Sequence, residues 1–323
     1  MSKNSKPILI VAGEPLGIFF EIFFKSLKKK RKSPLILIAN KELLQKQMKL
    51  LKFNIKINTL KNYNNFKEKK LKKNSINLIN VHLKFNSLKK IKIKDANLYI
   101  SKSFKIALEL LKKNREFRLI NGPIIKKNFL KKKYLGITEY LGDKTNRLSK
   151  IVMLIYNKDL SVSPITTHIP IKNVHNYITK EKIINHVKTI NNFYKHTKRK
   201  KPNIAITGLN PHCESNYDSS EEKRIIIPSI KILKKLGYKV SGPFPADTIF
   251  LKKNVKKLDV IVGMYHDQVL TPIKTLFGFK AINITLGLPF IRISPDHGPN
   301  LDMFGKNKSN PQSLFEALNF LDR

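Results

Sequence analysis

The segments Pro7-Ile-Leu-Ile-Val-Ala12 and Pro34-Leu-Ile-Leu-Ile-Ala39 decide the fold class. Each is short, continuously apolar and rich in branched residues, which is typical of β-strands that are covered on both faces. The residues between them, 18–30, predict a helix. Because repeated strand and helix units build parallel sheets, this part of the chain predicts an α/β fold.

The same alternation continues along the chain. We expect further helices at 43–51, 101–113 and 172–200, and further strands at 76–81, 117–120, 151–156, 160–165, 203–207, 240–242, 260–263 and 281–284. The polar segment 52–94 is expected to be a variable outer part of a lobe. A chain of 323 residues suits two lobes. The sequence therefore predicts a two-lobed αβα architecture with mostly parallel sheets.

The chain is strongly basic, with 64 Lys and Arg against 22 Asp and Glu and a net charge of +42. Such a charge would attract nucleic acid, anionic lipid or phosphorylated metabolites. However, lysine-rich runs such as 28–32, 69–73 and 131–133 are spread over the whole chain, whereas a nucleic-acid-binding arm would be localised. With Trp absent and Lys, Asn and Ile abundant, the composition looks like drift toward AT-rich codons at surface positions. We therefore expect no specific nucleic-acid partner.

Cysteine usage and hydropathy indicate the compartment. Cys213 is the only cysteine, so no intrachain disulfide can form and a cysteine-based zinc site is excluded. The apolar stretch 7–12 is too short for a signal-peptide core, and no apolar run approaches membrane-spanning length. The sequence thus predicts a soluble, cytoplasmic protein without a membrane partner.

Three histidines each follow an apolar, strand-like segment. His168 lies in SPITTHIP (163–170), His212 in GLNPH (208–212) and His266 in MYHDQ (264–268), as the printed sequence shows. Their separations exclude a local helix motif, but three neutral imidazoles from different loops could converge on a divalent metal and leave positions open for substrate. Alternatively, each histidine hydrogen-bonds its own turn. The spacing alone leaves both interpretations open.

Eight sequence blocks in order carry a family resemblance over nearly the whole chain: GEPLGI, NGPIIK, GITEYLGD, TTHIPI, GLNPH, GPFPADTIF, MYHDQ and NITLGLPFIRISPDHG. Any one block is weak, but eight in order are highly specific. The chain resembles the 4-hydroxythreonine-4-phosphate dehydrogenase family, whose fold is similar to that of isocitrate and isopropylmalate dehydrogenases. The resemblance implies NAD(P)-dependent oxidation of 4-phosphooxy-threonine to a 2-amino-3-oxo acid. This acid loses CO2 to give 3-amino-2-oxopropyl phosphate, on the route to pyridoxine 5'-phosphate.

The resemblance also implies a metal site, a dimer and a division of the chain. His168, His212 and His266 fall on the family's metal ligands, which bind one divalent ion, Zn, Mg, Mn or Co, in a site shared between the two subunits of a homodimer. The implied lobes are 1–126 plus 281–323, which contacts the cofactor, and 127–280, which binds metal and substrate and dimerises.

The family's substrate-binding positions coincide with Thr138, Lys274, Asn283 and Arg292. Their chemistry is suitable, because Arg and Lys neutralise a phosphate or carboxylate while Asn orients a hydroxyl or carboxylate oxygen. For Lys274 the alternative is one more solvated lysine. Arg292 is harder to explain in that way, since arginine is scarce in this chain.

The nicotinamide cofactor, NAD or NADP, is implied by a block near the C-terminus. Asp296, His297, Gly298 and Asp302 lie in a segment that looks like the cofactor-binding loop of the isocitrate and isopropylmalate dehydrogenases. No Gly-x-Gly-x-x-Gly follows a strand, so an ordinary Rossmann site is not supported. Without the resemblance, this block would be read only as a polar turn.

The proton acceptor is left unassigned by the sequence. Lys126, Asp247 and Asp267 all lie in family-like blocks and could act through water, but the sequence gives neither distances nor pKa values. The stretch Gly13-Glu-Pro-Leu-Gly17 lacks the Lys-Ser/Thr of a Walker motif, so we interpret it as a structural strand-to-helix turn.

The chain departs from the family pattern at three places. Ile137 occupies a substrate-binding position that is a histidine in the family, and a hydrocarbon cannot donate a hydrogen bond. Losing such a contact would cost on the order of 1 to 3 kcal/mol. Phe19-Phe20 stands where Gly-Pro is usual, and residues 213–222 replace a glycine-rich stretch.

Three other functions stay open at this stage. A related dehydrogenase of threonate or erythronate 4-phosphate would use the same metal and fold. A degenerate, inactive family member is suggested by Ile137 and the altered glycine-rich stretch. A basic nucleic-acid-binding protein is suggested by the charge, although the chain lacks a recognisable reading module, an aromatic platform and a localised basic arm.

Overall fold

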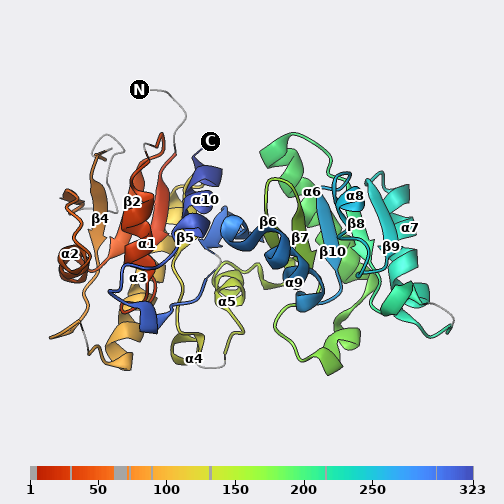
Figure 1. The fold of residues 1–323 in the computed structure, drawn as a ribbon, viewed down its shortest axis with the longest axis horizontal. Helices are drawn as coiled ribbons and strands as arrows, with labels where there is room; N and C mark the ends of the chain where they lie inside the picture. The colour runs from red at the N-terminus through yellow and green to blue at the C-terminus, as the bar shows by residue number, and fades with distance from the viewer. Residues whose placement is uncertain are drawn as a thin grey trace. The chain divides into compact units, whose positions relative to one another are not determined.

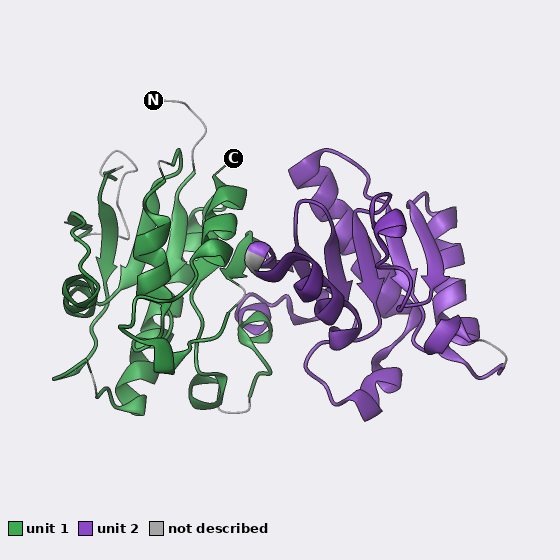
Figure 2. Cartoon of the chain, in the orientation of Figure 1, with its two compact units in different colours: residues 1–140, 289–323 green, residues 141–288 purple. Residues whose placement is uncertain are grey.

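The chain forms two compact units, residues 1–140 with 289–323 and residues 141–288 (Figure 2). The computed structural model describes residues 6–29, 31–61, 71–72, 74–88, 90–130, 133–214, 217–295 and 297–322. Unit 1 is discontinuous and contains both chain ends. The sequence placed the boundaries at 126/127 and 280/281, earlier along the chain than the structure does. What each unit binds stays a prediction.

Unit 1 is built on a parallel sheet with the strand order β3-β4-β2-β1-β5-β12 (Figure 1). The central strand β1 has no exposed side chain, because both of its faces are covered. The strands are β1 (Ile8–Val11), β2 (Leu35–Ala39), β3 (Ile57–Thr59), β4 (Ile76–Asn80), β5 (Arg118–Asn121) and β12 (Arg292–Pro295).

The helices of unit 1 pack on this sheet and on one another. The long helix α3 contacts β1 and β2, while α10 contacts β12 and α1. α5 contains the first boundary between the units. The helices are α1 (Phe19–Ser26), α2 (Lys41–Leu50), α3 (Ile93–Lys113), α4 (Lys126–Phe129), α5 (Ile137–Lys144) and α10 (Gln312–Leu321).

Unit 2 has a mixed sheet with the strand order β11-β6-β7-β10-β8-β9. β6 is antiparallel to both of its neighbours, whereas β7, β10, β8 and β9 are mutually parallel. The strands are β6 (Val152–Tyr156), β7 (Ser161–Pro164), β8 (Ile204–Thr207), β9 (Val240–Phe244), β10 (Val260–Gly263) and β11 (Ile282–Leu286). The predicted α/β class with a mostly parallel sheet is confirmed.

The helices of unit 2 cover its sheet. α6 contacts β6 and β11, α7 contacts β9, and α9 contacts β7 and β10. The helices are α6 (Lys180–Lys198), α7 (Ile227–Lys235), α8 (Lys252–Val255) and α9 (His266–Phe277), with a π-helical turn (Glu222–Ile226) leading into α7 and a 3-10 segment (Ile171–Tyr177) before α6.

Several element boundaries differ from the prediction. The helix predicted at 172–200 begins only at Lys180, where the side chain of Thr179 accepts a hydrogen bond from Lys182 N–H. α3 begins at Ile93, earlier than predicted, and no side-chain cap marks that start in the sequence. α9 was not predicted, because it lacks a side-chain cap and carries Pro272 in its interior.

The unusual Phe19-Phe20 pair opens α1, in which four phenylalanines stack at helical spacing. The Phe19 and Phe23 ring centroids lie 6.1 Å apart and those of Phe20 and Phe24 6.0 Å apart. A Cβ on Gly122 would lie 2.6 Å from the Phe19 ring, so a glycine is needed beneath it. The Phe19-Phe20 pair, which departs from the family pattern, is therefore accommodated in the packed core of unit 1.

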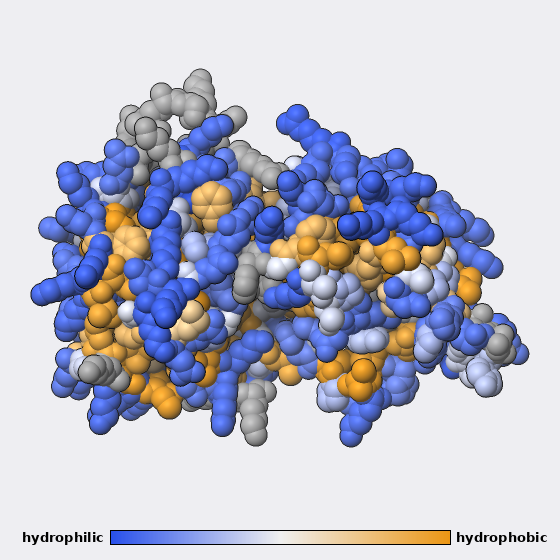
Figure 3. Space-filling model, viewed as in Figure 1, coloured by the Kyte–Doolittle hydropathy of each residue, from blue (hydrophilic) through white to orange (hydrophobic). Residues whose placement is uncertain are grey.

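Hydrophilic side chains are spread over both units on the face shown in Figure 3, rather than gathered on one of them. This distribution agrees with the dispersal of lysines along the sequence. Among the described residues, no helix is both long enough and apolar enough to cross a membrane.

Candidate active site

Three neighbouring parallel strands of unit 2 each lead into a segment that carries one of the predicted histidines. β10 lies between β7 and β8 in the sheet (Figure 1). His168 follows β7, His266 follows β10 and His212 follows β8. Because the carboxyl ends of parallel strands lie at one edge of a sheet, the three segments start from the same edge, which is where open α/β sheets bind ligands.

Two of these histidines lie close together. The ring centroids of His168 and His266 are 5.8 Å apart, with the ring planes inclined at 41°. His168 is exposed, and the His266 side chain is 33% exposed at the start of α9. The Nδ1 atom of His266 lies 2.6 Å from the carboxylate of Asp267, which leaves Nε2 of that ring available to a ligand.

His212 lies in a short 3-10 turn, Pro211–Cys213, and is exposed. Its backbone is left-handed, with φ at 56°, and Cys213 follows with φ at 57°. Within the described part of the chain, no group of three or more His, Cys, Asp and Glu side chains is arranged to hold a metal ion. One chain therefore brings His168 and His266 together without completing a three-ligand site.

Hydrogen bonds tie the three segments to one another below the histidines. Both the backbone N–H and the hydroxyl of Thr166, in the His168 segment, donate to the carbonyl oxygen of Met264. The buried side chain of Gln268 bonds to Thr207 and Gly208 at the end of β8 and to the N–H of Met264. The loops are thus fixed from inside the protein, while the His168 and His212 side chains are exposed.

A buried carboxylate holds the loop that carries His212. Glu222 is fully buried and accepts hydrogen bonds from the N–H groups of Leu209 and Asn210 at 2.7 and 2.9 Å, and from the Asn210 side chain at 2.8 Å. A Cβ on Gly208 would lie 3.0 Å from this carboxylate. The residues that stand in place of the family's glycine-rich stretch therefore supply an anchor of their own.

The predicted substrate residues of unit 1 form a buried polar cluster around Arg292, on β12. Its side chain donates through Nε to Asn121 Oδ1 at 2.7 Å and through Nη1 to Thr138 Oγ1 at 3.3 Å. Burial lowers the pKa of Arg292 to about 10, and the carboxylate of Glu139 acts in the opposite direction. The guanidinium remains charged at neutral pH. Beside Thr138, Ile137 is 7% exposed.

Two predicted substrate residues belong to unit 2. Lys274 is an exposed residue of α9, the helix that His266 begins. Asn283 lies on β11 and is half-buried, and its Oδ1 is a buried atom that accepts no hydrogen bond from the described residues. An amide in this state is suited to receiving a hydrogen bond from a ligand.

The predicted cofactor residues lie in the segment between β12 and α10. Asp296 falls outside the described residues. His297 is half-buried, whereas Gly298 and Asp302 are exposed. The segment is held at both ends by α1 and the turn before it: Ile18 N–H donates to the Pro299 carbonyl, and Lys25 and Glu21 bond to the backbone of Ser309.

The three candidates for the proton acceptor are all exposed. Lys126 is the first residue of α4, and Asp247 lies in the turn after β9. The Asp267 side chain is 79% exposed and is bonded to His266. Asp267 thus has a contact that suits it to orienting a histidine, in addition to any role in proton transfer.

The GEPLG segment is a structural turn between β1 and α1. Gly13 has φ at 81°, and the Glu14 N–H donates to the Pro123 carbonyl at 2.9 Å. The Glu14 carboxylate accepts from the Ile125 N–H at 3.3 Å. Burial raises the pKa of Glu14, and the hydrogen bond from Ile125 acts in the opposite direction. The turn is packed against the chain's own backbone rather than open to a phosphate.

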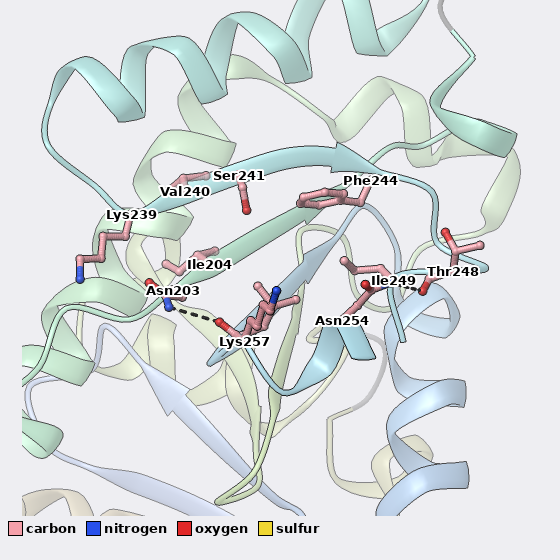
Figure 4. Close-up of a pocket in the computed structure, with 11 residues that line it drawn as sticks. Asn203, Ile204, Lys239, Val240, Ser241, Phe244, Thr248, Ile249, Asn254 and Lys257 are labelled. Atoms are coloured by element: carbon pink, nitrogen blue, oxygen red, sulfur yellow. Dashed lines mark hydrogen bonds between the residues drawn. The ribbon is translucent and has the colours of Figure 1, made fainter. Parts of the chain in front are cut away.

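A separate hollow of about 500 Å³ lies between β8, β9 and α8 (Figure 4). Its lining is mixed, with five apolar residues among eleven, and it contains none of the predicted site residues. Two asparagines that line the hollow donate hydrogen bonds to backbone carbonyls: Asn203 to that of Lys257 and Asn254 to that of Thr248. Because no predicted site residue lines the hollow, it is not part of the candidate site.

Sequence reasoning did not single out the side chains that support the site, which are Asn121, Glu222 and Gln268. Gln268 and Asn121 lie inside quoted blocks, MYHDQ and NGPIIK, but Gln and Asn carry no distinctive chemistry in a sequence. Glu222 lies in the stretch that was noted only for lacking glycine. Their roles depend on contacts between distant segments, which a single sequence does not display.

The fold is that of an α/β protein, with a candidate ligand site at the carboxyl ends of parallel strands. Residues 30–321 match the family model described as "Pyridoxal phosphate biosynthetic protein PdxA". The chain belongs to this family.

Named relatives agree with this assignment. The chain is 39% identical to a 4-hydroxythreonine-4-phosphate dehydrogenase of Sulfurihydrogenibium sp., over 96% of each chain, and 34% identical to one of Aquifex aeolicus, over 98% of each. The crystal structure of 4-hydroxythreonine-4-phosphate dehydrogenase from Klebsiella pneumoniae superposes with a TM-score of 0.83 at 27% identity, over 98% of each chain. The relatives are dehydrogenases, so the family is one of oxidoreductases.

Proposed function

We propose that this chain oxidises the secondary alcohol of 4-hydroxythreonine 4-phosphate with NAD or NADP. A hydride passes to the nicotinamide and a proton is released, which leaves a 2-amino-3-oxo acid. Loss of CO2 from this acid gives 3-amino-2-oxopropyl phosphate. The names of the relatives support the substrate, and the strand-end histidines of unit 2 are the observation that carries the proposal.

The donor set of unit 2 suits a divalent metal. His168, His212 and His266 are imidazoles on segments that start from one sheet edge, and Asp267 engages the Nδ1 of His266 so that Nε2 is free for ligation. We propose that these residues hold one Zn, Mg, Mn or Co ion, in a site shared between two subunits of a homodimer. Such an ion acts as a Lewis acid on the oxygens of the substrate.

In unit 1, Arg292 is suited to bind an anionic group of the substrate. It is charged, buried and aligned by Asn121 and Thr138, so that little side-chain entropy is lost on binding. In unit 2, Lys274 supplies a second positive charge, and Asn283 Oδ1, which accepts no hydrogen bond from the described residues, is available to a substrate donor. These assignments give the anionic groups of the substrate cationic partners, and give a substrate amino or hydroxyl group an amide acceptor.

The nicotinamide cofactor is assigned to the segment containing Asp296, His297, Gly298 and Asp302. Support comes from the way α1 holds this segment through Pro299 and Ser309, since a firmly held loop is a suitable platform for a ligand. Lys126, Asp247 and Asp267 remain the candidates for the proton acceptor.

A second candidate function is favoured by Ile137. The side chain is buried and apolar where the family has a histidine, so one hydrogen bond to the substrate is lost. A related substrate that does not require this contact, such as threonate or erythronate 4-phosphate, is then a competitor for the same site.

The test is to follow the absorbance of reduced nicotinamide at 340 nm with 4-hydroxythreonine 4-phosphate and NAD or NADP. The protein is first treated with a chelator, and Zn²⁺, Mg²⁺, Mn²⁺ or Co²⁺ is then added back. We expect turnover that depends on added metal and that His212→Ala abolishes, while His196→Ala on the exposed face of α6 retains it. Turnover only with threonate or erythronate 4-phosphate would support the second candidate, and no turnover with any substrate would refute both.

A further inference from the structure

One buried side chain, Gln268, connects the ends of β8 and β10. Its carboxamide oxygen accepts hydrogen bonds from the Met264 N–H at 2.7 Å and from the Thr207 hydroxyl at 2.9 Å. Its carboxamide nitrogen donates to the Gly208 carbonyl at 2.8 Å. A single residue of α9 is therefore bonded to both strand ends.

These bonds begin where the pairing of β8 with β10 ends. The ladder between β8 and β10 ends at the pair Ile206 and Val262. Beyond that pair, β8 and β10 lead into the segments that carry His212 and His266. The Gln268 side chain connects these two strand ends. Glu222, by contrast, bonds to Leu209 and Asn210 within a single loop.

The surroundings of Gln268 fit a carboxamide better than a carboxylate or an apolar side chain. Its oxygen faces two donors and its nitrogen faces an acceptor, so a carboxylate would be repelled by the Gly208 carbonyl. An apolar side chain would leave the Met264 N–H buried without a partner. A Cβ on Gly263 would lie 3.0 Å from the Gln268 oxygen, so the glycine lets the amide come this close.

Gln268 stands next to both proposed metal ligands along the chain. It is two residues after His266 on α9, and its acceptor Gly208 is four residues before His212. We propose that Gln268 is a positioning residue that fixes the loops of His212 and His266 and so sets the affinity of the protein for a divalent metal. This inference rests on the metal site of the proposed function.

The inference holds whether the two histidines serve one ion or two ions in a dimer. In either arrangement each imidazole is presented by a loop that Gln268 anchors in its own subunit. Residues that orient metal ligands from behind typically change metal affinity by 10- to 100-fold when they are removed, because the ligands must then be ordered at the moment of binding.

The experiment compares three variants of the full-length protein after removal of bound metal with a chelator. Gln268→Ala removes all three bonds, and Thr207→Val removes one bond with little change in volume. Gln47→Ala is the matched control, because Gln47 is also buried and donates to a backbone carbonyl, that of Pro15, in unit 1. Zn²⁺ affinity is measured by competition with a chromogenic chelator, the ligand field by the visible spectrum with Co²⁺, and thermal stability on the metal-free proteins.

We expect Gln268→Ala to weaken Zn²⁺ binding by roughly 10- to 100-fold and to alter the Co²⁺ spectrum, and Thr207→Val to weaken binding by about 2- to 5-fold. Gln47→Ala should lower thermal stability to a similar degree but keep the Zn²⁺ affinity and the Co²⁺ spectrum of the wild type. A purely structural role of Gln268 would lower stability alone.

Unchanged Zn²⁺ affinity and Co²⁺ spectrum in folded Gln268→Ala would overturn the inference and leave the proposed function standing. If Gln268→Ala does not fold, Thr207→Val decides: wild-type affinity in that variant overturns the inference. A wild-type protein that binds neither ion would refute the metal site itself, and the inference with it, so the two failures give different results.

Discussion

The charged cluster of unit 1 and the histidine segments of unit 2 are preorganised in opposite ways. In unit 1, the side chain proposed to bind substrate is itself fixed: Arg292 is 3% exposed and bonded to Asn121 and Thr138. In unit 2, His168 and His212 are exposed, and the fixed parts are the loops beneath them, held by Gln268 and by other buried polar side chains.

The difference follows from the chemistry of the groups. A buried guanidinium is always charged, so it requires permanent partners that compensate for its lost hydration. A metal-binding imidazole must keep one ring nitrogen free, so its order has to come from the backbone and from the other nitrogen. The comparison predicts that substitutions in the Arg292 cluster act on substrate binding and that substitutions beneath the histidine segments act on metal binding.

The largest expected effect is that of Arg292→Ala. Removal of a buried, hydrogen-bonded charge from an anion site costs about 4 kcal/mol, which corresponds to a loss in kcat/KM of roughly 1,000-fold. Zn²⁺ affinity should be unchanged. Steady-state kinetics with 4-hydroxythreonine 4-phosphate measure kcat/KM, and competition with a chromogenic chelator measures the Zn²⁺ affinity. Arg115→Ala, at an exposed position, serves as the control. A loss below tenfold would contradict the assignment of Arg292.

The second prediction concerns a histidine that is buried rather than exposed. His186, on α6, contacts Ser163 Oγ through Nε2 at 2.6 Å, and the Ser163 hydroxyl donates to the Met153 carbonyl. The serine oxygen therefore accepts from the Nε2–H of a neutral ring. Burial, together with a smaller effect of the nearby charge of Lys182, lowers the pKa of His186 to about 3.

Because the unfolded chain binds this proton near pH 6.5 and the folded protein does not, stability is lost as pH falls from 6.5 toward 3. At pH 4.5, the lowered pKa of His186 reduces the free energy of unfolding by about 3 kcal/mol relative to pH 7. Urea unfolding of the metal-free protein measures the free energy of unfolding at pH 7 and at pH 4.5. The decrease between the two pH values should be smaller in His186→Gln than in the wild type. His196→Gln, at the exposed end of the same helix, should behave as the wild type. Equal losses in all three would refute the prediction.

The contrast between the units also explains how much of the fold the sequence predicted. Strands such as β1 and β10 were found because they are buried on both faces and read as uninterrupted apolar runs. α9 escaped notice because it starts with polar residues and contains Pro272, both of which indicate a loop. Its existence depends on packing against β7 and β10, which local pattern does not reveal.

The candidate site was predicted unevenly for a related reason. His168, His266 and Arg292 could be named because their chemistry is distinctive and they lie in family-like blocks. The proximity of the two histidines, at 5.8 Å between ring centroids, required the strand order β7-β10-β8, which a sequence does not give. Asn121 binds Arg292 across 171 positions of the chain, so its role could be recognised only in the folded protein.

A third prediction uses the departure at residue 137. Restoring a histidine with Ile137→His should add a hydrogen-bond donor beside Thr138 and lower KM for 4-hydroxythreonine 4-phosphate by about tenfold, equivalent to about 1.4 kcal/mol. Ile137→Leu controls for the change in packing at this buried position. If Ile137→His instead lowers KM for threonate 4-phosphate, Ile137 is not an adaptation to that alternative substrate.

The smallest expected effect comes from Thr138, whose hydroxyl accepts a 3.3 Å bond from Arg292 Nη1. Thr138→Val keeps the shape and removes the acceptor, which should cost about 1 kcal/mol and raise KM about fivefold with kcat little changed. Thr138→Ser retains the hydroxyl and should remain near the wild type. Because Asn121 still holds the Nε atom, the guanidinium stays in place and loses only part of its alignment. A loss in kcat/KM as large as that of Arg292→Ala would mean that Thr138 contacts the substrate directly. A change in Zn²⁺ affinity would show that the Arg292 cluster and the histidine segments do not act separately.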